Sequence, residues 1–120
     1  MKIAFESRTI EDIIKQLEKD RTTFARETLE QMKLASPTSL KVTLEMLKRS
    51  VKSTLKSCLE REYYVSLKMV ETHDFKEGIR ARLIDKDFKP KWKPQKAEEI
   101  SDDQIASFFK EIPNAKFDIN

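Results

Sequence analysis

A chain of 120 residues that is 38% hydrophobic and 38% charged has room for one modest hydrophobic core beneath a densely charged surface. Its single glycine excludes the Gly-rich phosphate loops of nucleotide-binding folds and any Gly-rich oxyanion loop, because both need several glycines for close backbone approach to a ligand. A net charge of +3, from 24 basic and 21 acidic residues, is too small to indicate a nucleic-acid-binding domain by itself.

Two short helices are expected within residues 9–35. Thr9 followed three residues later by Asp12 is the pattern of a capping box, which indicates where the first helix begins. A polar stretch at 20–23 then separates the first helix from the second. The apolar side chains recur at helical spacing, and they are Ile10, Ile13, Ile14 and Leu17 in the first helix and Ala25, Leu29 and Met32 in the second.

A long helical segment is expected over residues 37–71, as one helix or as two abutting ones. Ser36 followed by Pro37 indicates its start, because serine is a preferred N-cap and proline suits the first helical position. We expect a kink or a restart near Ser50 and residues 53–54. The apolar stripe of the segment consists of Leu40, Leu44, Leu47, Val51, Leu55, Leu59, Tyr63, Leu67 and Val70.

A further helix and an extended strap are expected after the long segment. We expect the helix to cover residues 73–85 with Asp74 as its N-cap, because aspartate ahead of an apolar run is a common capping residue. Its apolar stripe is Phe75, Ile79 and Leu83. Residues 86–100 include two prolines, which exclude regular helix and favour extended chain before each of them.

A final helix is expected over residues 101–112. Ser101 followed by Gln104 is a second capping-box pattern, and Pro113 is expected to end the helix ahead of a loosely held tail. We find no run of period-two alternation, no internal repeat and no low-complexity tract. The sequence therefore predicts an all-α fold, a compact array of five to six helices in a single domain covering residues 1–120.

The candidates for chemistry do not predict a catalytic or metal site. His73 beside Asp74 suggests an acid–base pair, but we favour the reading in which Asp74 caps a helix and His73 is its neighbour at a corner of the chain. Cys58 is the only cysteine, which excludes an intramolecular disulfide, and we expect it to be a small buried hydrophobic residue. The glutamates weighed as a carboxylate pair are Glu60, Glu62, Glu71 and Glu77. We expect no metal and no cofactor.

The sequence also gives no sign of a membrane span or an address. No apolar run approaches the roughly 18 residues that cross a bilayer. The N-terminal stretch has neither the apolar core of a signal peptide nor the Arg- and Ser-rich, acid-poor composition of a transit peptide. We therefore expect no membrane partner.

Gly78 and the strap are the most informative features of the sequence. A mid-helix glycine costs about 0.5–1 kcal/mol relative to alanine, so we expect tight packing against it, by another helix rather than by a ligand. Phe88 and Trp92 lie on the strap among Lys86, Lys89, Lys91, Lys93 and Lys96. Two interpretations remain open: the lysines bind phosphates, or they are only solvated while Trp92 anchors the strap to the core.

The run HDFKEGIRARLIDKD at 73–87, followed by PKWKP at 90–94, resembles the C-terminal signature of the 3-hydroxyisobutyryl-CoA hydrolases. These enzymes belong to the crotonase (enoyl-CoA hydratase/isomerase) superfamily. Residues 9–20, 36–47 and 60–69 are similar to helices that precede the signature in this family. The signature positions that match here are Asp74, Phe75, Glu77, Gly78 and Trp92.

The resemblance implies that residues 1–120 are the helical C-terminal region of a crotonase-like fold. The family's catalytic carboxylates, oxyanion-hole amides and spiral β-sheet lie upstream, so we expect no thioesterase activity from this chain alone. The complete enzyme is implied to hydrolyse an acyl-CoA thioester in valine breakdown, in mitochondria, with coenzyme A as part of the substrate. In the family this region covers the acyl-CoA site. Lys86 matches a lysine that approaches the coenzyme A phosphates, and we expect Lys89 and Lys91 to join it.

Two other functions fit parts of the sequence. The first is a stand-alone helical module that self-associates through its apolar stripes, since large exposed apolar patches seldom stay unpaired. The second, less favoured, is a small basic nucleic-acid binder that uses residues 86–96. The partners we expect are the acyl-CoA substrate, the missing N-terminal core and a second copy of the chain, and we expect no nucleic acid.

Overall fold

The computed structural model describes residues 9–110, and over that range the chain forms six α-helices and two short helices of other types. The all-α prediction is confirmed for these residues. The α-helices are α2 (Ile10–Lys19), α3 (Thr23–Leu34), α4 (Pro37–Ser50), α5 (Leu55–Met69), α6 (His73–Ile79) and α7 (Asp102–Ser107). The short ones are a π-helix, η1 (Arg80–Ile84), and a 3₁₀-helix, η2 (Ala97–Glu99).

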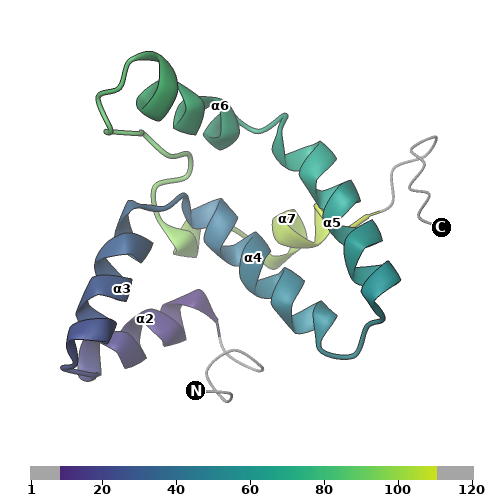
Figure 1. The fold of residues 1–120 in the computed structure, drawn as a ribbon, viewed down its shortest axis with the longest axis horizontal. Coiled ribbons are helices and arrows are strands. Elements are labelled where there is room, and N and C mark those ends of the chain that lie inside the picture. The colour runs from purple at the N-terminus through teal and green to yellow at the C-terminus, as the bar shows by residue number, and fades with distance from the viewer. Residues whose placement is uncertain (1–8, 111–120) are drawn as a thin grey trace.

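The helices are arranged around α4 (Figure 1). The α2–α3 pair lies at the N-terminal end of α4, while α5 diverges from α4 at the loop that connects them. α7 lies between α4 and α5, and the chain reaches it from α6 by passing the junction of α3 and α4. No helix among residues 9–110 is long and apolar enough to cross a membrane.

Each of the six α-helices begins at a serine or threonine that caps it. The hydroxyl oxygen of the capping residue accepts a hydrogen bond from the backbone N–H three residues later, which satisfies one of the free donors at a helix start. The predicted caps at Thr9, Ser36 and Ser101 are confirmed, and Thr9 and Ser101 form complete capping boxes. The other caps are Thr22, Thr54 and Thr72.

The predicted break in the long helical segment is confirmed, because α4 and α5 are separate helices. Near the end of α4, the Ser50 hydroxyl donates to the Met46 carbonyl at 2.7 Å and the Ser53 hydroxyl donates to the Arg49 carbonyl at 2.5 Å. The Arg49 carbonyl is one of the last four of α4, which lack an intrahelical N–H, whereas the Ser50 hydroxyl bonds back onto the preceding turn. Thr54 then caps α5.

Two small clusters of buried residues form the core. The first joins α4, α5 and α7 through Val42, Val65, Ile100 and Ile105. The second joins α2 to α4 through Ile10, Ile13 and Leu44. Between them, the ammonium group of Lys41 donates to the Ile100 carbonyl at 3.2 Å and lies 3.3 Å from a Glu11 carboxylate oxygen, which ties α2, α4 and the start of α7 together.

The predicted apolar stripe of residues 37–71 is only partly the buried face. Five of its members are exposed: Leu47, Val51, Leu55, Leu67 and Val70. Within the described chain α4 buries Leu44, a member of the stripe, together with Val42, which lies outside it, and α5 buries Val65. Cys58 is half-buried rather than buried. Helical spacing identifies a face that is able to be buried, but residues 9–110 supply nothing that covers much of it.

The last two predicted helices are shorter than expected. The helix predicted over 73–85 is α-helical only to Ile79, after which η1 continues with wider turns, closed by the Asp85 N–H donating to the Arg80 carbonyl at 2.8 Å. α7 ends at Ser107, ahead of the predicted residue 112. Residues 111 and 112, Pro113 and the predicted tail lie outside the described residues.

Candidate functional site

The strap predicted over residues 86–100 is shorter in the structure, because residues 97–99 form η2, and the name is kept from here on for residues 86–96. The strap has two distinct faces. From residue 89 to residue 94, exposed and half-buried residues alternate without exception. The exposed positions are Lys89, Lys91 and Lys93, and the half-buried ones are Pro90, Trp92 and Pro94. An extended chain has a side-chain period of two, so this segment presents lysines on one side and apolar rings on the other.

This alternation agrees with the extended chain predicted before Pro90 and Pro94, and it forms no strand. The sequence FKPKWKP at 88–94 alternates apolar and basic residues throughout. Proline argues against a strand, but it is fully compatible with an extended segment that pairs with no neighbouring strand.

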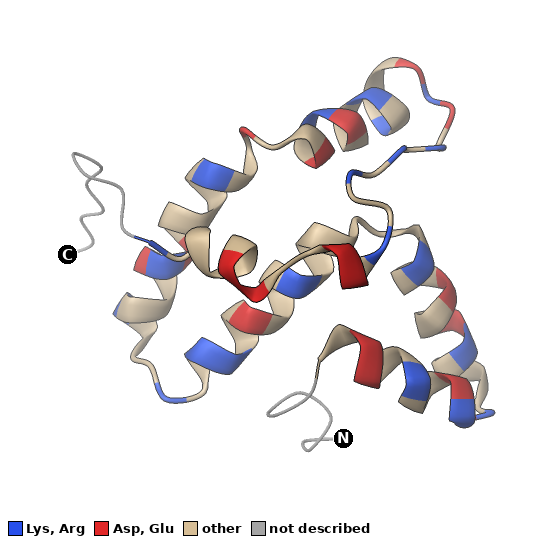
Figure 2. Cartoon of the chain, turned by 180° about the vertical axis from the view of Figure 1, so that it is seen from behind, with Lys and Arg blue, Asp and Glu red and all other residues tan. Residues whose placement is uncertain are grey.

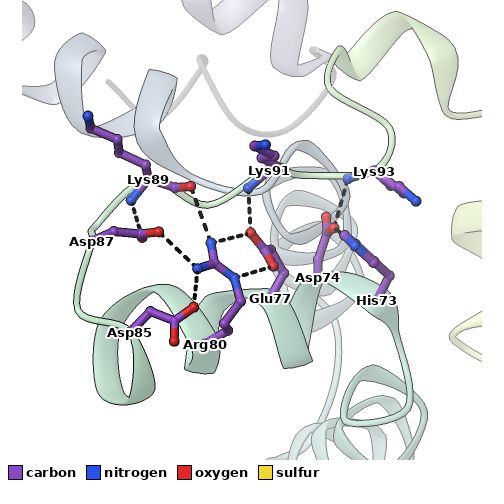
Figure 3. A network of polar contacts seen from close by, with 9 residues as sticks. All are labelled: His73, Asp74, Glu77, Arg80, Asp85, Asp87, Lys89, Lys91 and Lys93. Carbon is purple, nitrogen blue, oxygen red and sulfur yellow. Dashed lines mark hydrogen bonds and ion pairs between the residues drawn. The ribbon is translucent and has the colours of Figure 1, made fainter.

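Glu77 on α6 fixes the middle of the strap (Figure 3). The Arg80 guanidinium donates to both Glu77 carboxylate oxygens, each at 2.8 Å, and the Lys91 backbone N–H donates to Glu77 Oε2 at 2.8 Å. The bidentate guanidinium, together with the Lys91 amide, lowers the pKa of the Glu77 carboxyl to about 2. Glu77 therefore stays ionised through the physiological range.

Arg80 also holds the turn that leads into the strap. Its Nη1 donates to Asp85 Oδ2 at 2.7 Å and to Asp87 Oδ2 at 2.9 Å, so one guanidinium meets three carboxylates in all. These carboxylates raise the pKa of Arg80, with Glu77 contributing most. Asp87 in turn accepts from the Lys89 N–H at 2.9 Å, and its pKa is lowered by Arg80 and by that amide.

Asp74 fixes the far end of the strap and is 5% exposed. Its Oδ2 accepts from the Ser36 hydroxyl at 2.5 Å, and its Oδ1 accepts from the Lys93 N–H at 2.9 Å and lies 3.0 Å from His73 Nδ1. The prediction that Asp74 caps α6 was wrong, because Thr72 is the cap and Asp74 is the second residue of the helix. An aspartate near a helix start suits either the N-cap or the first turn. Here Asp74 lies in the first turn, and its carboxylate bonds to Ser36.

His73 and Ser36 do not form a nucleophile–base pair in this arrangement. The Ser36 hydroxyl donates to Asp74 and also accepts the N–H of Ser39 as the cap of α4, so its hydrogen is not directed at the imidazole. His73 lies at the exposed corner where α6 begins. Among residues 9–110, no three His, Cys, Asp or Glu side chains group as metal ligands.

The side chain of Trp92 packs over Gly78 of α6. A Cβ atom added to Gly78 would lie 3.5 and 3.7 Å from two atoms of the Trp92 ring. Close packing against Gly78 was predicted, but the prediction that a helix packs there was wrong, because the neighbour is the indole of the strap. The indole N–H donates to the Leu34 carbonyl at 3.1 Å. Trp92 therefore attaches the strap to both α6 and the end of α3.

Two hollows flank this assembly. The larger, about 650 Å³, has mainly apolar walls that include Leu34, Phe75, Ile79, Phe88 and Trp92. The smaller, about 290 Å³, is lined by groups that include His73, Lys93, Thr38 and Ser107. Asp74 borders both hollows and separates them.

The lysines predicted to contact phosphates occupy two different settings. Lys89 and Lys91 lie on the strap with exposed side chains, which point away from the carboxylates (Figure 3). Lys86 lies in the turn at the start of the strap with a left-handed backbone φ of 56°, and Phe88 shares that conformation. Contact of any of these lysines with phosphate stays a prediction. Of the signature positions, Asp74, Glu77, Gly78 and Trp92 are parts of the strap attachment, whereas Phe75 is exposed on the wall of the larger hollow.

The pKa of Glu77 predicts how the strap responds to acid. Because the folded pKa of about 2 lies below the ordinary value of 4.5, the ion pair stabilises the fold fully above pH 4.5 and loses this contribution as the pH falls toward 2. Carbon-detected NMR of the Glu77 carboxyl should show a midpoint near 2. Arg80→Lys keeps the charge but loses the bidentate geometry, so the midpoint should move toward 4.5. A midpoint near 4.5 in the unaltered chain would contradict this geometry.

Replacing Gly78 by alanine is expected to stabilise the chain. The added methyl group would meet the Trp92 ring at ordinary contact distance, while the helix gains about 0.5–1 kcal/mol from losing its glycine. Urea unfolding followed by the fluorescence of the single tryptophan measures the free energy of unfolding. Gly78→Leu is the control, because its larger side chain competes with the indole for space and should destabilise. A loss of stability in the alanine variant would argue against the packing described.

The chain is similar in sequence to a known enzyme family. The sequence model of the enoyl-CoA hydratase/isomerase family matches residues 1–109. Mitochondrial 3-hydroxyisobutyryl-CoA hydrolase from Bos taurus is 44% identical over 108 residues, and the Homo sapiens enzyme is 43% identical. Both alignments cover 90% of this chain and 28% of the relative. Small ribosomal subunit protein mS47 of Arabidopsis thaliana is 43% identical over 84% of this chain and 26% of its own length.

Solved structures agree in fold over nearly the whole chain. A carnitinyl-CoA dehydratase from Mycobacterium thermoresistibile superposes with a TM-score of 0.83 at 32% identity, covering 93% of this chain and 32% of that one. An enoyl-CoA hydratase from Rhodobacter sphaeroides gives 0.79 at 33% identity, covering 88% and 32%. The chain thus spans under a third of the length of these relatives. It belongs to the enoyl-CoA hydratase/isomerase family, within the crotonase superfamily.

Proposed function

We propose that this chain is the helical part of a 3-hydroxyisobutyryl-CoA hydrolase. The observation that supports this choice within the family is sequence identity. The bovine hydrolase is 44% identical over 90% of the chain, whereas the dehydratase and hydratase of known structure are 32% and 33% identical. The hydrolase relatives are named as mitochondrial, so we place the complete enzyme in mitochondria, in the breakdown of valine.

The reaction of the complete enzyme is acyl transfer to water. The oxygen of a water molecule bonds to the thioester carbonyl carbon, the carbon–sulfur bond breaks, and the coenzyme A sulfur leaves as the thiol with a proton. Backbone amides stabilise the oxyanion, and carboxylates move the protons. We assign these groups to the two thirds or more of the relatives' length that this chain does not span.

In this proposal the chain contributes binding and packing rather than chemistry. Lys86, Lys89 and Lys91 contact the phosphates of coenzyme A, whose charge complements them. The exposed apolar residues of α4 and α5 pack against the remainder of the enzyme or against another subunit, because an apolar surface of that extent is usually covered in a soluble protein.

A chimeric enzyme tests the proposal. In the bovine hydrolase, the 108 aligned residues are replaced by the matching residues of this chain, and release of thiol from 3-hydroxyisobutyryl-CoA is followed. We expect turnover within about tenfold of the bovine enzyme, since a tenfold loss corresponds to about 1.4 kcal/mol of transition-state stabilisation. The 120-residue chain alone should show no turnover.

The matched control is the same chimera carrying the corresponding segment of the Rhodobacter enoyl-CoA hydratase. It should be much less active on this substrate if the segment is adapted to the hydrolase. A folded chimera of this chain that is inactive, or turnover by the isolated chain near that of the complete enzyme, would refute the proposal.

A second candidate function is self-association or assembly through the apolar surface. Eleven large hydrophobic residues of the described chain are exposed, and one relative of similar identity is named as a protein of the small ribosomal subunit. Sedimentation of the 120-residue chain tests whether it associates with itself. A stable dimer or trimer that persists in dilute solution would favour assembly, whereas a monomer would argue against it.

A further inference from the structure

We propose that Lys68 is an acylation site, at which an acyl-CoA thioester transfers its acyl group to the side-chain amine and thereby loosens α7 from α5. The inference concerns the contact between these two helices and involves none of the strap lysines. It rests on the proposed function only for the source of the reagent, because an enzyme with acyl-CoA substrates works where such thioesters are present.

Lys68 closes the C-terminal end of α7 from a neighbouring helix. It lies half-buried in the last turn of α5, and its Nζ donates to the Ser107 carbonyl at 2.9 Å and to the Lys110 carbonyl. Figure 2 shows the chain beyond α7 passing close to α5, with basic residues on both segments. Since the last carbonyls of a helix have no intrahelical donor, Lys68 supplies N–H groups that the end of α7 lacks.

The setting of Lys68 favours loss of its proton. Its Nζ faces two carbonyl oxygens, whereas the ammonium group of Lys41, which also bonds to a carbonyl, lies 3.3 Å from a Glu11 carboxylate oxygen. Desolvation by burial, and after it repulsion from the Lys110 ammonium group, lower the pKa of Lys68. Lys68 therefore carries the neutral, nucleophilic amine at a lower pH than an ordinary lysine side chain does.

The neutral amine fits the two carbonyls as well as the ammonium group does. After one proton is lost to solvent, the nitrogen keeps two N–H groups, one for each carbonyl, and gains a free lone pair. The lone pair bonds to the thioester carbonyl carbon, and the carbon–sulfur bond breaks with its electron pair on sulfur. The nitrogen then loses a second proton, which ends on the leaving thiol. One amine and one acyl-CoA thus give one amide and one free coenzyme A.

Acylation removes the charge and one N–H from this contact. The amide nitrogen has a single N–H for two carbonyls, so one carbonyl at the end of α7 loses its donor. α7 is only six residues long and packs on α4 and α5 through Ile105, in the cluster that contains Val42 and Val65. So short a helix depends on its tertiary contacts. Acylation of Lys68 should therefore loosen α7 and uncover this part of the core.

The experiment treats the 120-residue chain with acetyl-CoA at mildly alkaline pH and follows acetylation of each lysine by peptide mass spectrometry. If exposure alone decided the rate, exposed lysines such as Lys89 and Lys91 would be acetylated first. We expect Lys68 to lead although it is half-buried. In concentrated urea, the matched control condition, the preference for Lys68 should disappear because it depends on the fold.

Lys110→Gln tests the cause of the reactivity. The variant keeps the backbone carbonyl that accepts from Lys68 and removes the neighbouring cation, so acetylation of Lys68 should slow. Lys56→Gln is the matched control, because it removes the same charge from an exposed position of α5 about 18 Å along the helix from Lys68. It should leave the rate at Lys68 unchanged.

Hydrogen exchange tests the effect on α7. Lys68→Gln imitates the acylated side chain and should speed exchange of the Ile105 and Phe108 amides by about threefold or more, within the range for a charge at a helix end. Lys68→Arg keeps the charge and the donors and should exchange like the unaltered chain. The unaltered chain, once acetylated, should match Lys68→Gln.

The proposal is overturned if the strap lysines are acetylated ahead of Lys68 in the folded chain, or if Lys110→Gln leaves the rate at Lys68 unchanged. It is also overturned if Lys68→Gln and Lys68→Arg exchange alike. An active chimera together with a chain that shows no preference for Lys68 leaves the proposed function standing and removes the acylation site. Preferred acetylation of Lys68 together with an inactive chimera keeps the site and refutes the hydrolase assignment.

Discussion

The contact between Arg80 and Glu77 is the interaction on which the rest of this end of the molecule depends. Three carboxylates, from Glu77, Asp85 and Asp87, converge on one guanidinium. Without the guanidinium their mutual repulsion would oppose the turn that brings the strap back over α6. With it, each carboxylate keeps accepting capacity for a second donor, and Glu77 and Asp87 use that capacity for backbone amides of the strap. The ion pair therefore fixes the path of a segment that has no regular secondary structure.

Asp74 likewise accepts hydrogen bonds from more than one part of the chain. Ser36 at the start of α4 and the Lys93 amide of the strap both donate to this buried carboxylate. Trp92 closes the arrangement by donating to the Leu34 carbonyl at the end of α3. The strap thus replaces helix-on-helix packing at the junction of α3, α4 and α6. A chain with only two small buried clusters is held together there by polar contacts whose geometry is specific.

The sequence predicts local structure well where one side chain decides it. Helix starts at Thr9, Ser36 and Ser101 follow from a hydroxyl that satisfies an amide within the next turn, which needs no knowledge of the fold. The break before Thr54 follows in the same way. Thr72 and Asp74 show the limit of such reasoning, because both suit a helix start. The choice depends on Ser36, 38 positions away in the chain.

Contacts between distant parts of the chain at the site could not be predicted from local sequence patterns. A mid-helix glycine reports that something packs against it, and Gly78 does, but the identity of the neighbour depends on how the strap turns back. That turn needs left-handed backbone at Lys86 and Phe88, which no local pattern announces in non-glycine residues. The alternation of lysines with apolar rings, by contrast, was readable. The prolines that exclude helix and strand there also predict the extended segment, which needs no strand partner.

The exposed apolar face and the cationic strap have different meanings, and the distinction follows from what holds each in place. Leu47, Val51 and Leu55 are exposed because helical periodicity places them on a face that residues 9–110 do not cover, in a chain that spans less than a third of its relatives. These side chains form an apolar face without a covering surface among the described residues. The lysine side chains of the strap are exposed although carboxylates lie close by, because those carboxylates bond to Arg80, to Ser36 and to backbone amides of the strap. Exposure of the strap lysines is therefore set by contacts within the described chain, whereas exposure of the apolar face is set by the absence of a covering surface among residues 9–110.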